Sequence, residues 1–300
     1  MSTLIQVMGL NKFFGDKQAL NNVDFEIEKG APVALVGPNG AGKTTLFSVL
    51  CGYIQASSGN VEVFGSLPGS NATFGRLAAL PQDAQLDPRF SIAHQLSFYG
   101  QLQGFNKKKS KSEVERTLEL VGLSDTLNEK PYALSHGMRK RVTIAQALMG
   151  TPDIVMLDEA TAGLDPLHAR EIRQLVASLS SDVTFILSSH DLNELERLCQ
   201  KVLYLDKGVL QRHKTLGKDS DFSYFTLRME KQESGLIDGL KSIQQVVDVV
   251  NSQDREYLIS VKQDGEKTPS DIQILQMCHQ QKWSYRELVN GKTLENQLFK

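Results

Sequence analysis

A short glycine-rich segment, residues 37–44, has the composition and spacing of a loop that binds phosphate groups. It reads Gly-Pro-Asn-Gly-Ala-Gly-Lys-Thr, which fits the pattern G-x-x-x-x-G-K-[ST]. The glycines let successive backbone N–H groups turn toward a phosphate, and the helix expected from Lys43 onward adds the positive end of its dipole. Lys43 can reach the β- and γ-phosphates, and the Thr44 hydroxyl can hold Mg²⁺. The segment predicts a nucleoside triphosphate site, without specifying ATP.

Two adjacent carboxylates follow an apolar run further along the chain. Residues 154–157 are all apolar, and Asp158 and Glu159 come directly after them. In an open parallel sheet, ligands bind at the carboxyl ends of the strands. Asp158 is then placed to order Mg²⁺, and Glu159 could polarise an attacking water. Without the phosphate loop this pair would be read as a strand ending in surface acidic residues; together with the loop, the catalytic interpretation is favoured.

The elements that must position these residues follow an α/β pattern. The apolar runs at 33–36, 154–157 and 183–187 predict strands buried on both faces, as in a parallel sheet. A helical pattern at 167–179 lies between two of them, an alternation typical of α/β proteins. Residues 92–134 indicate a helical insertion, and 203–205 one more strand.

The pattern changes beyond residue 215. Residues 222–229 and 257–261 alternate like half-exposed strands, whereas 235–243 and 270–279 indicate helices. We therefore expect a small C-terminal α+β domain over residues 216–300.

Composition and charge argue against several classes of protein, among them nucleic-acid-binding, membrane-spanning and secreted proteins. The net charge of −2 gives no indication of nucleic-acid binding, and no run of 18 apolar residues predicts a membrane span. The N-terminus does not have the pattern of a secretory signal, and three widely spaced cysteines fit a reducing cytosol better than a disulfide framework. The one charge run, at 107–111, is read as a solvated helix start; contact with lipid headgroups or a partner is the alternative.

Five further segments resemble motifs of ABC ATPases. Residues 134–141, Leu-Ser-His-Gly-Met-Arg-Lys-Arg, resemble the signature motif. Gln82 resembles the glutamine of the Q-loop, and residues 162–166, which contain Asp165, resemble the D-loop. His190 follows a predicted strand where the switch histidine stands, and Phe14 is similar to the aromatic residue that stacks on adenine.

This resemblance implies a P-loop NTPase core with a mostly parallel sheet over residues 1–215, carrying a helical insertion at about 85–135. It further implies a head-to-tail dimer in which ATP and Mg²⁺ lie between two subunits. The nucleotide is expected to contact one subunit through Phe14, Gly37, Pro38, Asn39, Gly40, Ala41, Gly42, Lys43, Thr44 and Thr45. From the other subunit it is expected to contact Ser135, His136, Gly137 and Asp165.

The resemblance also implies individual roles. Glu159 is expected to be the general base, with Lys43, Gln82 and His190 as the other catalytic residues, and Thr44, Gln82 and Asp158 are expected to hold Mg²⁺. His136 stands where the family usually has glycine. Its side chain could crowd the partner's nucleotide or point away. We expect the site to tolerate this histidine, because Ser135 and Gly137 match the family pattern.

The expected function is ATP hydrolysis coupled to transport through a separate transmembrane permease, with a second copy or a related subunit as dimer partner. Such a protein lies in the cytoplasm, peripheral on the inner face of the cell membrane. Residues 83–104 are candidates for the permease contact, and residues 294–299 resemble the tails of bacterial export subunits. No nucleic-acid partner is expected.

Two other function classes remain. A non-transport ABC ATPase of DNA repair or translation usually has long coiled coils, zinc modules or two nucleotide domains, and the sequence offers too little room between Gln82 and Ser135 for a long coiled coil. A non-hydrolysing scaffold is the other alternative, against which Glu159 and His190 argue.

Overall fold

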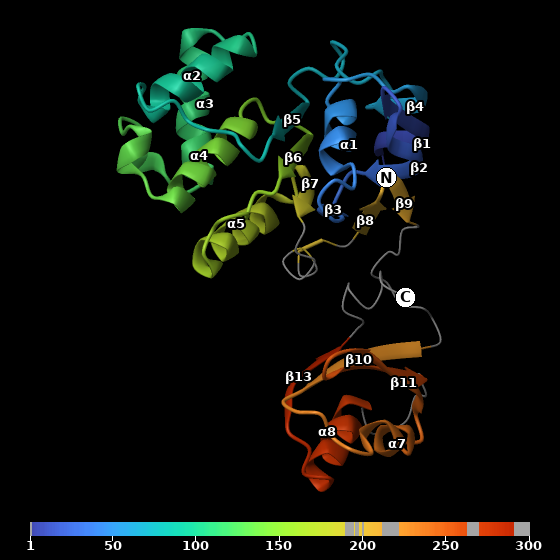
Figure 1. Cartoon of the computed structure of the whole chain (residues 1–300). Coiled ribbons are helices and arrows are strands. Elements are labelled where there is room, and N and C mark those ends of the chain that lie inside the picture. Colours follow the sequence, from blue (N-terminus) through green and yellow to red (C-terminus); the bar gives the residue numbers. More distant parts are fainter. Residues whose placement is uncertain are drawn as a thin grey trace. The chain divides into compact units, whose positions relative to one another are not determined.

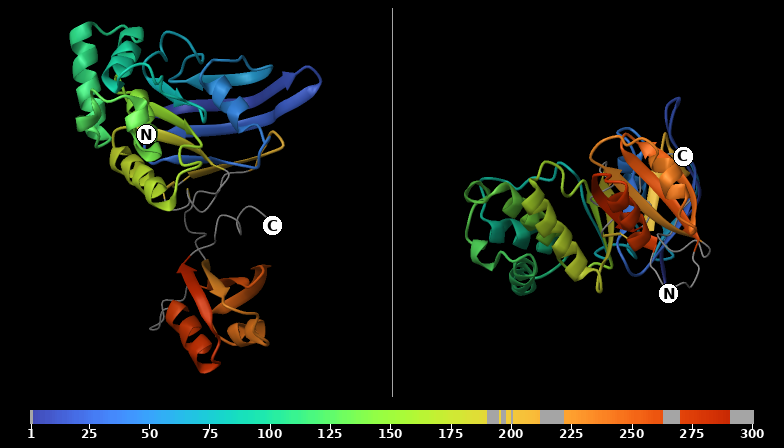
Figure 2. Two further views of the ribbon diagram at one scale, coloured as in Figure 1. Left: turned by 60° about the vertical axis from the view of Figure 1, so that its left-hand side comes forward. Right: turned by 90° about the horizontal axis from the view of Figure 1, so that it is seen from below.

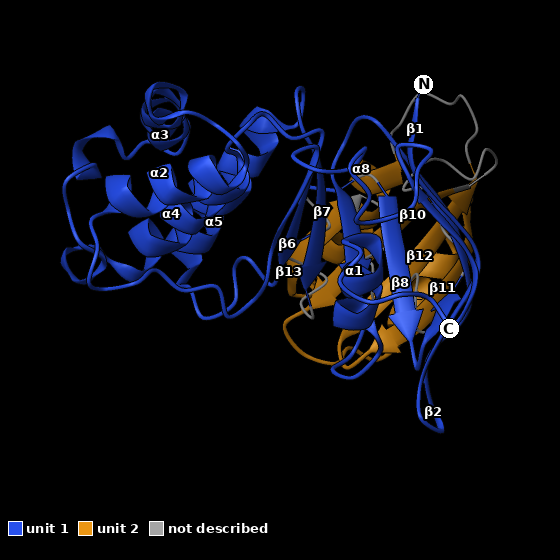
Figure 3. Cartoon of the chain, turned by 90° about the horizontal axis from the view of Figure 1, so that it is seen from above, with its two compact units in different colours: residues 1–215 blue, residues 216–300 orange. Residues whose placement is uncertain are grey.

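The computed structural model describes residues 2–189, 195, 198–199, 201–211, 222–262 and 270–290. The chain divides into two compact units, Met1–Thr215 and Leu216–Lys300, which are coloured separately in Figure 3. The division falls where the sequence pattern changes. Among the described residues, no helix is long and apolar enough to cross a bilayer.

The first unit is built around a six-stranded sheet with the order β5-β6-β7-β3-β8-β9. The strands are β5 (Leu77–Leu80), β6 (Ile154–Asp158), β7 (Thr184–Ser189), β3 (Val33–Val36), β8 (Lys201–Asp206) and β9 (Val209–Gln211). All neighbours are parallel except β9, which pairs antiparallel with β8. Every residue of β3, β6 and β7 is buried, as expected of strands covered on both faces. The prediction of a mostly parallel sheet is confirmed.

A second sheet in this unit was not predicted. It is antiparallel, with the order β2-β1-β4, and consists of β1 (Thr3–Phe14), β2 (Lys17–Glu28) and β4 (Ser58–Val63). Helix α1 (Lys43–Leu50) contributes Leu46 and Phe47 to a core that also contains side chains of both sheets. Figure 1 shows α1 between the strands of the two sheets, so the helix that follows the glycine-rich loop is held from two sides.

The other helices described in the first unit gather away from α1 (Figures 1 and 2). They are α2 (Ile92–Leu102), α3 (Lys107–Leu120), α4 (His136–Ala147) and α5 (Pro166–Leu179), with the 3₁₀ turns η1 (Ser124–Thr126) and η2 (Pro131–Ala133). A capping side chain begins each α-helix of this group by accepting a backbone N–H bond: Ser91, Asn106, Ser135 and Asp165, in chain order.

The second unit has the element order β-α-β-β-α-β. Its elements are β10 (Phe222–Met229), α7 (Leu236–Lys241), β11 (Val246–Gln253), β12 (Glu256–Lys262), α8 (Ser270–Gln280) and β13 (Tyr285–Asn290). The sheet is antiparallel with the order β11-β12-β10-β13, the arrangement of a ferredoxin-like split βαβ fold. Leu240 of α7 and Ile274 of α8 share one core with Ile259 of β12. Both helices therefore cover the same face of the sheet.

Candidate functional site

The glycine-rich loop joins the end of β3 to the start of α1, and its first glycine has no room for a side chain. A Cβ atom at Gly37 would lie 2.0 Å from the carbonyl oxygen of Leu205 on the neighbouring strand β8. Gly42, which precedes α1, has a φ of 108°, a value that L side chains rarely adopt. The Lys43 ammonium donates hydrogen bonds to the carbonyls of Gly37 at 2.6 Å and Pro38 at 3.3 Å. The loop therefore curves around its own lysine.

The predicted carboxylate pair lies beside this loop. The Thr44 hydroxyl donates to Asp158 Oδ2 at 3.3 Å, and the Ser188 hydroxyl, at the end of β7, donates to Asp158 Oδ1. Ser188 Oγ also accepts the backbone N–H of Glu159 at 3.0 Å. Glu159 has a φ of 48°, in the left-handed region. One serine thus fixes both the Asp158 carboxylate and the backbone that turns Glu159 out of the sheet.

Phe14 lies at the end of β1 and exposes 51% of its surface. The Lys12 ammonium lies 5.1 Å from the centre of its ring. An exposed aromatic ring at the edge of a phosphate-binding cavity is suited to stacking against a base.

A cavity of about 650 Å³ brings these residues together. Of the residues expected to hold the nucleotide or its metal, it is lined by Phe14, Asn39, Gly40, Ala41, Gly42, Lys43, Thr44, Thr45, Gln82, Asp158 and Glu159. Gly37 and Pro38 do not line this cavity, and their carbonyls accept hydrogen bonds from the Lys43 ammonium. His190 lies outside the described residues.

The sequence analysis missed part of the cavity wall. Lys17, Gln18 and Ala19 at the start of β2 line it, as do Lys207 and Gly208 of the β8–β9 turn. Gly208 donates its N–H to the carbonyl of Ala41 at 2.9 Å, which ties this turn to the loop. The strand before Lys207-Gly208 was predicted, but a lysine-glycine turn carries no signal of chemistry, and only the strand order brings it to the nucleotide loop.

Known proteins share these features. The sequence profile of the family described as "ABC transporter" matches residues 20–162. The Nod factor export ATP-binding protein I of Cupriavidus metallidurans is 35% identical over 212 residues, which cover 69% of this chain and 70% of that protein. The linearmycin resistance ATP-binding protein LnrL of Bacillus subtilis is 32% identical over 68% of this chain and 67% of its own length. The chain belongs to the ABC transporter family.

Solved structures agree with this assignment. The protein cbiO1 of Clostridium perfringens, described as part of the ABC transporter complex cbiONQ, has a TM-score of 0.65 at 26% identity, covering 72% of this chain and 89% of its own. An ATP-binding cassette of an ABC transporter in its ADP conformation has a TM-score of 0.64 at 25% identity, over 72% of this chain and 92% of its own. The chain is therefore an ATP-binding and ATP-hydrolysing ABC transporter subunit.

The signature residues of this ABC ATPase lie elsewhere on the same unit. Ser135, His136 and Gly137 form the start of α4, and Asp165 caps α5. Among the described residues, these four do not line the cavity that contains the phosphate loop. The structure thus brings the phosphate loop, Phe14, Gln82 and the acidic pair to one cavity, whose described wall does not include the signature residues or Asp165.

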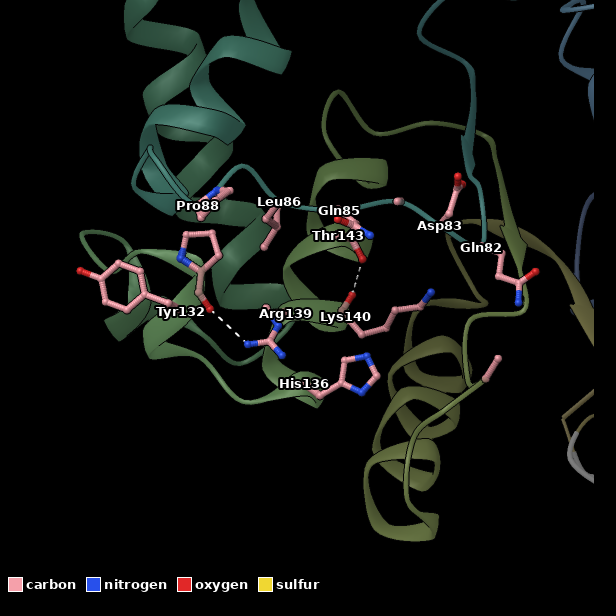
Figure 4. Close-up of a pocket in the computed structure, with 13 residues that line it drawn as sticks. Gln82, Asp83, Gln85, Leu86, Pro88, Tyr132, His136, Arg139, Lys140 and Thr143 are labelled. Carbon is pink, nitrogen blue, oxygen red and sulfur yellow. Dashed lines mark hydrogen bonds between the residues drawn. The ribbon is translucent and has the colours of Figure 1, made fainter.

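A second cavity of about 490 Å³ lies between the Q-loop and α4 (Figure 4). Gln82 lines this cavity as well as the first one, and His136 and Lys140 line it from α4. Burial lowers the pKa of Lys140, and the charges of Asp158 and Glu159 oppose that shift. The ABC ATPase therefore has a lysine of the signature helix within electrostatic reach of its own acidic pair.

Proposed function

We propose that this ATPase works as a head-to-tail pair that holds ATP and Mg²⁺ at the seam between two subunits. The observation that carries the proposal is the separation of the two sets of residues. The cavity with Lys43 and Glu159 lacks Ser135, Gly137 and Asp165 from its described wall. A second copy, or a related subunit, turned head to tail supplies them.

The start of α4 is suited to binding a phosphate group that is held by such a partner subunit. Ser135 Oγ accepts the N–H of Met138 at 3.2 Å, so its own O–H proton remains able to donate to a phosphate oxygen. The positive end of the helix dipole lies at the same place. Ser135 and Gly137 thus have the chemistry to bind the γ-phosphate held by the other subunit, with His136 beside them.

The other half of each site positions the reacting groups. The hydroxyl of Thr44 and the carboxylate of Asp158 are oxygen ligands that suit Mg²⁺, with Gln82 nearby. Bound Mg²⁺ supplies neutralisation of phosphate charge.

Each reacting group then has one task. Lys43 orients the β- and γ-phosphates, and Glu159 accepts a proton from the attacking water. His190, the residue that follows β7 in sequence, holds the γ-phosphate and this water in position. Asp165 enters from the other subunit and connects the two sites.

A groove at the far end of α1 suits the transmembrane permease. It has a volume of about 360 Å³ and is lined by residues of α2, α4 and the segment that precedes β5. Tyr53, Phe74 and Leu102 line it, and they expose 73%, 64% and 61% of their surfaces, an apolar character that favours a protein partner. Of the contact segment 83–104 predicted from sequence, Tyr99, Leu102 and Gln103 line the groove.

The wider assignment rests on the relatives. Two of them are named for export and for resistance, so export is the direction we propose, and they do not favour a non-transport role. Residues 1–215 are proposed as the nucleotide-binding domain, with the helical insertion at about 85–135, and residues 216–300 as an accessory domain. Through its permease the protein is held on the cytoplasmic face of the membrane.

A complementation experiment tests the seam. Lys43→Ala damages only the half-site that holds the nucleotide, whereas Ser135→Arg damages only the half-site supplied in trans. We expect each purified full-length variant to be inactive alone. Their mixture should recover roughly a quarter of the wild-type ATPase rate per chain, because random pairing gives half of the dimers one intact site.

The matched control mixes Lys43→Ala with Glu159→Gln, two lesions of the same half-site, which should recover nothing. If the first mixture also stays inactive while wild-type protein is active, the site is contained in one subunit and the proposal is wrong. The Glu159→Gln variant alone should accumulate as an ATP-bound dimer by light scattering. The exposed Glu28→Gln should behave as wild type.

A further inference from the structure

A histidine of the D-loop helix occupies the space beside the signature glycine. His168 lies in the first turn of α5, and its ring packs against Gly137 at the start of α4. A Cβ atom at Gly137 would lie 2.3 Å from His168 Cδ2 and 2.7 Å from Cγ. Only glycine therefore lets the ring approach the signature backbone this closely.

The same imidazole is fixed from its other side by Asp165. His168 Nδ1 lies 2.5 Å from Asp165 Oδ2. Asp165 Oδ1 accepts the backbone N–H groups of Leu167 and His168 at 3.0 and 3.1 Å, which caps α5. These hydrogen bonds hold the pKa of the Asp165 carboxyl below its ordinary value. The ring of His168 thus connects the D-loop aspartate to the signature glycine.

His136 of α4 makes a second approach between the two segments, toward Gly163 of the D-loop. A side-chain carbon at Gly163 of the D-loop would lie 3.8 Å from His136 Cε1. Figure 4 shows the His136 side chain extending from the start of α4. The histidine that replaces the usual signature glycine therefore leans toward the D-loop of its own subunit.

We propose that His168 is a positioning residue that fastens the signature segment, Ser135 to Gly137, to Asp165, so that both enter the partner's nucleotide site as one rigid unit. The contacts that carry this role are those of its ring with Gly137 and Asp165 in the same subunit. Groups that are fixed before binding lose less conformational entropy when the seam closes, which strengthens the closed dimer. This inference rests on the proposed function, since it concerns the half-site supplied in trans.

Three variants separate the two contacts of His168. His168→Phe keeps a ring against Gly137 but loses the nitrogen that meets Asp165. His168→Asn keeps a side-chain N–H group near Asp165 but loses the ring. His168→Ala loses both contacts, and His279→Ala, an exposed histidine of the second unit, is the matched control.

Two measurements are made on the full-length chain. Amide hydrogen exchange of the nucleotide-free protein reports how firmly residues 135–138 and 163–168 are held. Light scattering in the Glu159→Gln background reports the protein concentration at which ATP gives half-maximal dimer. A fluorescent ATP analogue, titrated at protein concentrations below that value, reports binding to the phosphate loop alone.

For His168→Ala we expect faster exchange in both segments and a rise of at least tenfold in the dimerisation concentration, with binding to the phosphate loop changed less than twofold. His168→Phe and His168→Asn should have exchange rates and dimerisation concentrations between those of His168→Ala and the parent protein. His279→Ala should match the parent in both measurements. A general loss of folding would instead speed exchange in α3 and weaken loop binding too.

Unchanged exchange in 135–138 with His168→Ala overturns the inference, as does an unchanged dimerisation concentration. If Glu159→Gln itself never dimerises with ATP, the proposed seam fails, whereas the exchange experiment still decides whether His168 holds the two segments together.

Discussion

The hydroxyl of Thr44 donates a hydrogen bond to Asp158 Oδ2 across 3.3 Å, although the two residues belong to different strand-loop units of the sequence. Thr44 stands in the first turn of α1, which follows β3, and Asp158 ends β6. Strand β7 pairs with both β3 and β6, so the carboxyl ends of these parallel strands meet at one edge of the sheet. This contact joins the phosphate loop to the acidic pair.

Replacing Lys43 should weaken nucleotide binding and abolish turnover. Lys43→Ala removes the ammonium that neutralises phosphate charge inside the loop, and loss of one charge-assisted contact of this kind costs about 1.5–3 kcal/mol. We expect the dissociation constant for ATP to rise at least tenfold, measured by isothermal titration calorimetry, and ATPase activity to fall to background. Lys29→Ala, at an exposed position between β2 and β3, should leave both unchanged. Wild-type affinity in Lys43→Ala would show that the loop does not bind the phosphates.

Ser188 should matter for catalysis more than for folding of the loop. Ser188→Ala removes the hydroxyl that donates to Asp158 and accepts from the backbone of Glu159. We expect kcat to fall about tenfold or more and the Mg²⁺ concentration for half-maximal activity to rise, because a hydrogen bond to a charged group is worth about 1.5–3 kcal/mol. Steady-state ATPase assays over a Mg²⁺ series measure both values. Ser178→Ala, on the exposed side of α5, is the control; equal effects of the two variants would contradict this role.

Two glycines of the loop should respond differently to alanine. Gly37→Ala would press a methyl group against the Leu205 carbonyl, and such overpacking costs about 1–3 kcal/mol or more. Gly40→Ala meets nothing within 4 Å and has only the strain of its positive φ, about 1–2 kcal/mol. Thermal unfolding of the nucleotide-free protein should therefore show a larger loss in Tm for Gly37→Ala. A smaller loss than for Gly40→Ala would mean that β8 can move away from the loop.

The stability of α3 should depend on pH through Glu113. Hydrogen bonds from the Arg116 guanidinium and from the Gly150 N–H hold the pKa of Glu113 below its ordinary value of 4.5. Because the folded-state pKa is the lower one, this contribution is present above pH 4.5 and is lost as the pH falls through the folded-state value.

Glu113→Gln should lower the opening free energy of α3 amides at pH 7 by about 1 kcal/mol, measured by native-state hydrogen exchange. The difference from wild type should shrink as Glu113 of the wild type becomes protonated. Glu119→Gln, exposed on the same helix, should change little at either pH. A difference of the same size at low pH would assign the effect to packing and not to charge.

The elements that could be predicted from the sequence are those in which burial produces a simple pattern of residue types, either an all-apolar run or a regular alternation. The all-apolar run at 33–36 forms β3 with those bounds, and the run at 154–157 forms β6 with Asp158 added. Alternation likewise predicted β10 at 222–229. Motif spacing located Lys43 and Asp158, because phosphate binding requires a fixed order of residue types along a short segment.

The antiparallel sheet of β1, β2 and β4 was not predicted, although residues 23–28 of β2 alternate strictly between buried and exposed positions. In β1 the pattern is less regular, because register shifts against β2, for example between Val7 and Leu10, interrupt the alternation. Ser188 and His168 were missed as site residues for a different reason. Their roles come from contacts with Asp158 and with Gly137 and Asp165, and a serine in a buried strand or a histidine in a helix carries no signal of them.

The backbone oxygen of Leu205 lies directly against Gly37 of the phosphate loop. This contact determines how short a fragment of the chain could be and still keep the nucleotide pocket. The family profile ends at residue 162. The phosphate loop nevertheless rests on Leu205 of β8, 43 positions later, and the turn after β8 is hydrogen-bonded to Ala41. A truncation after residue 162 would retain the phosphate loop, the signature segment and the acidic pair, but it would lose the surface on which the phosphate loop rests. A fragment that keeps the loop on this surface must therefore extend at least through the turn after β8.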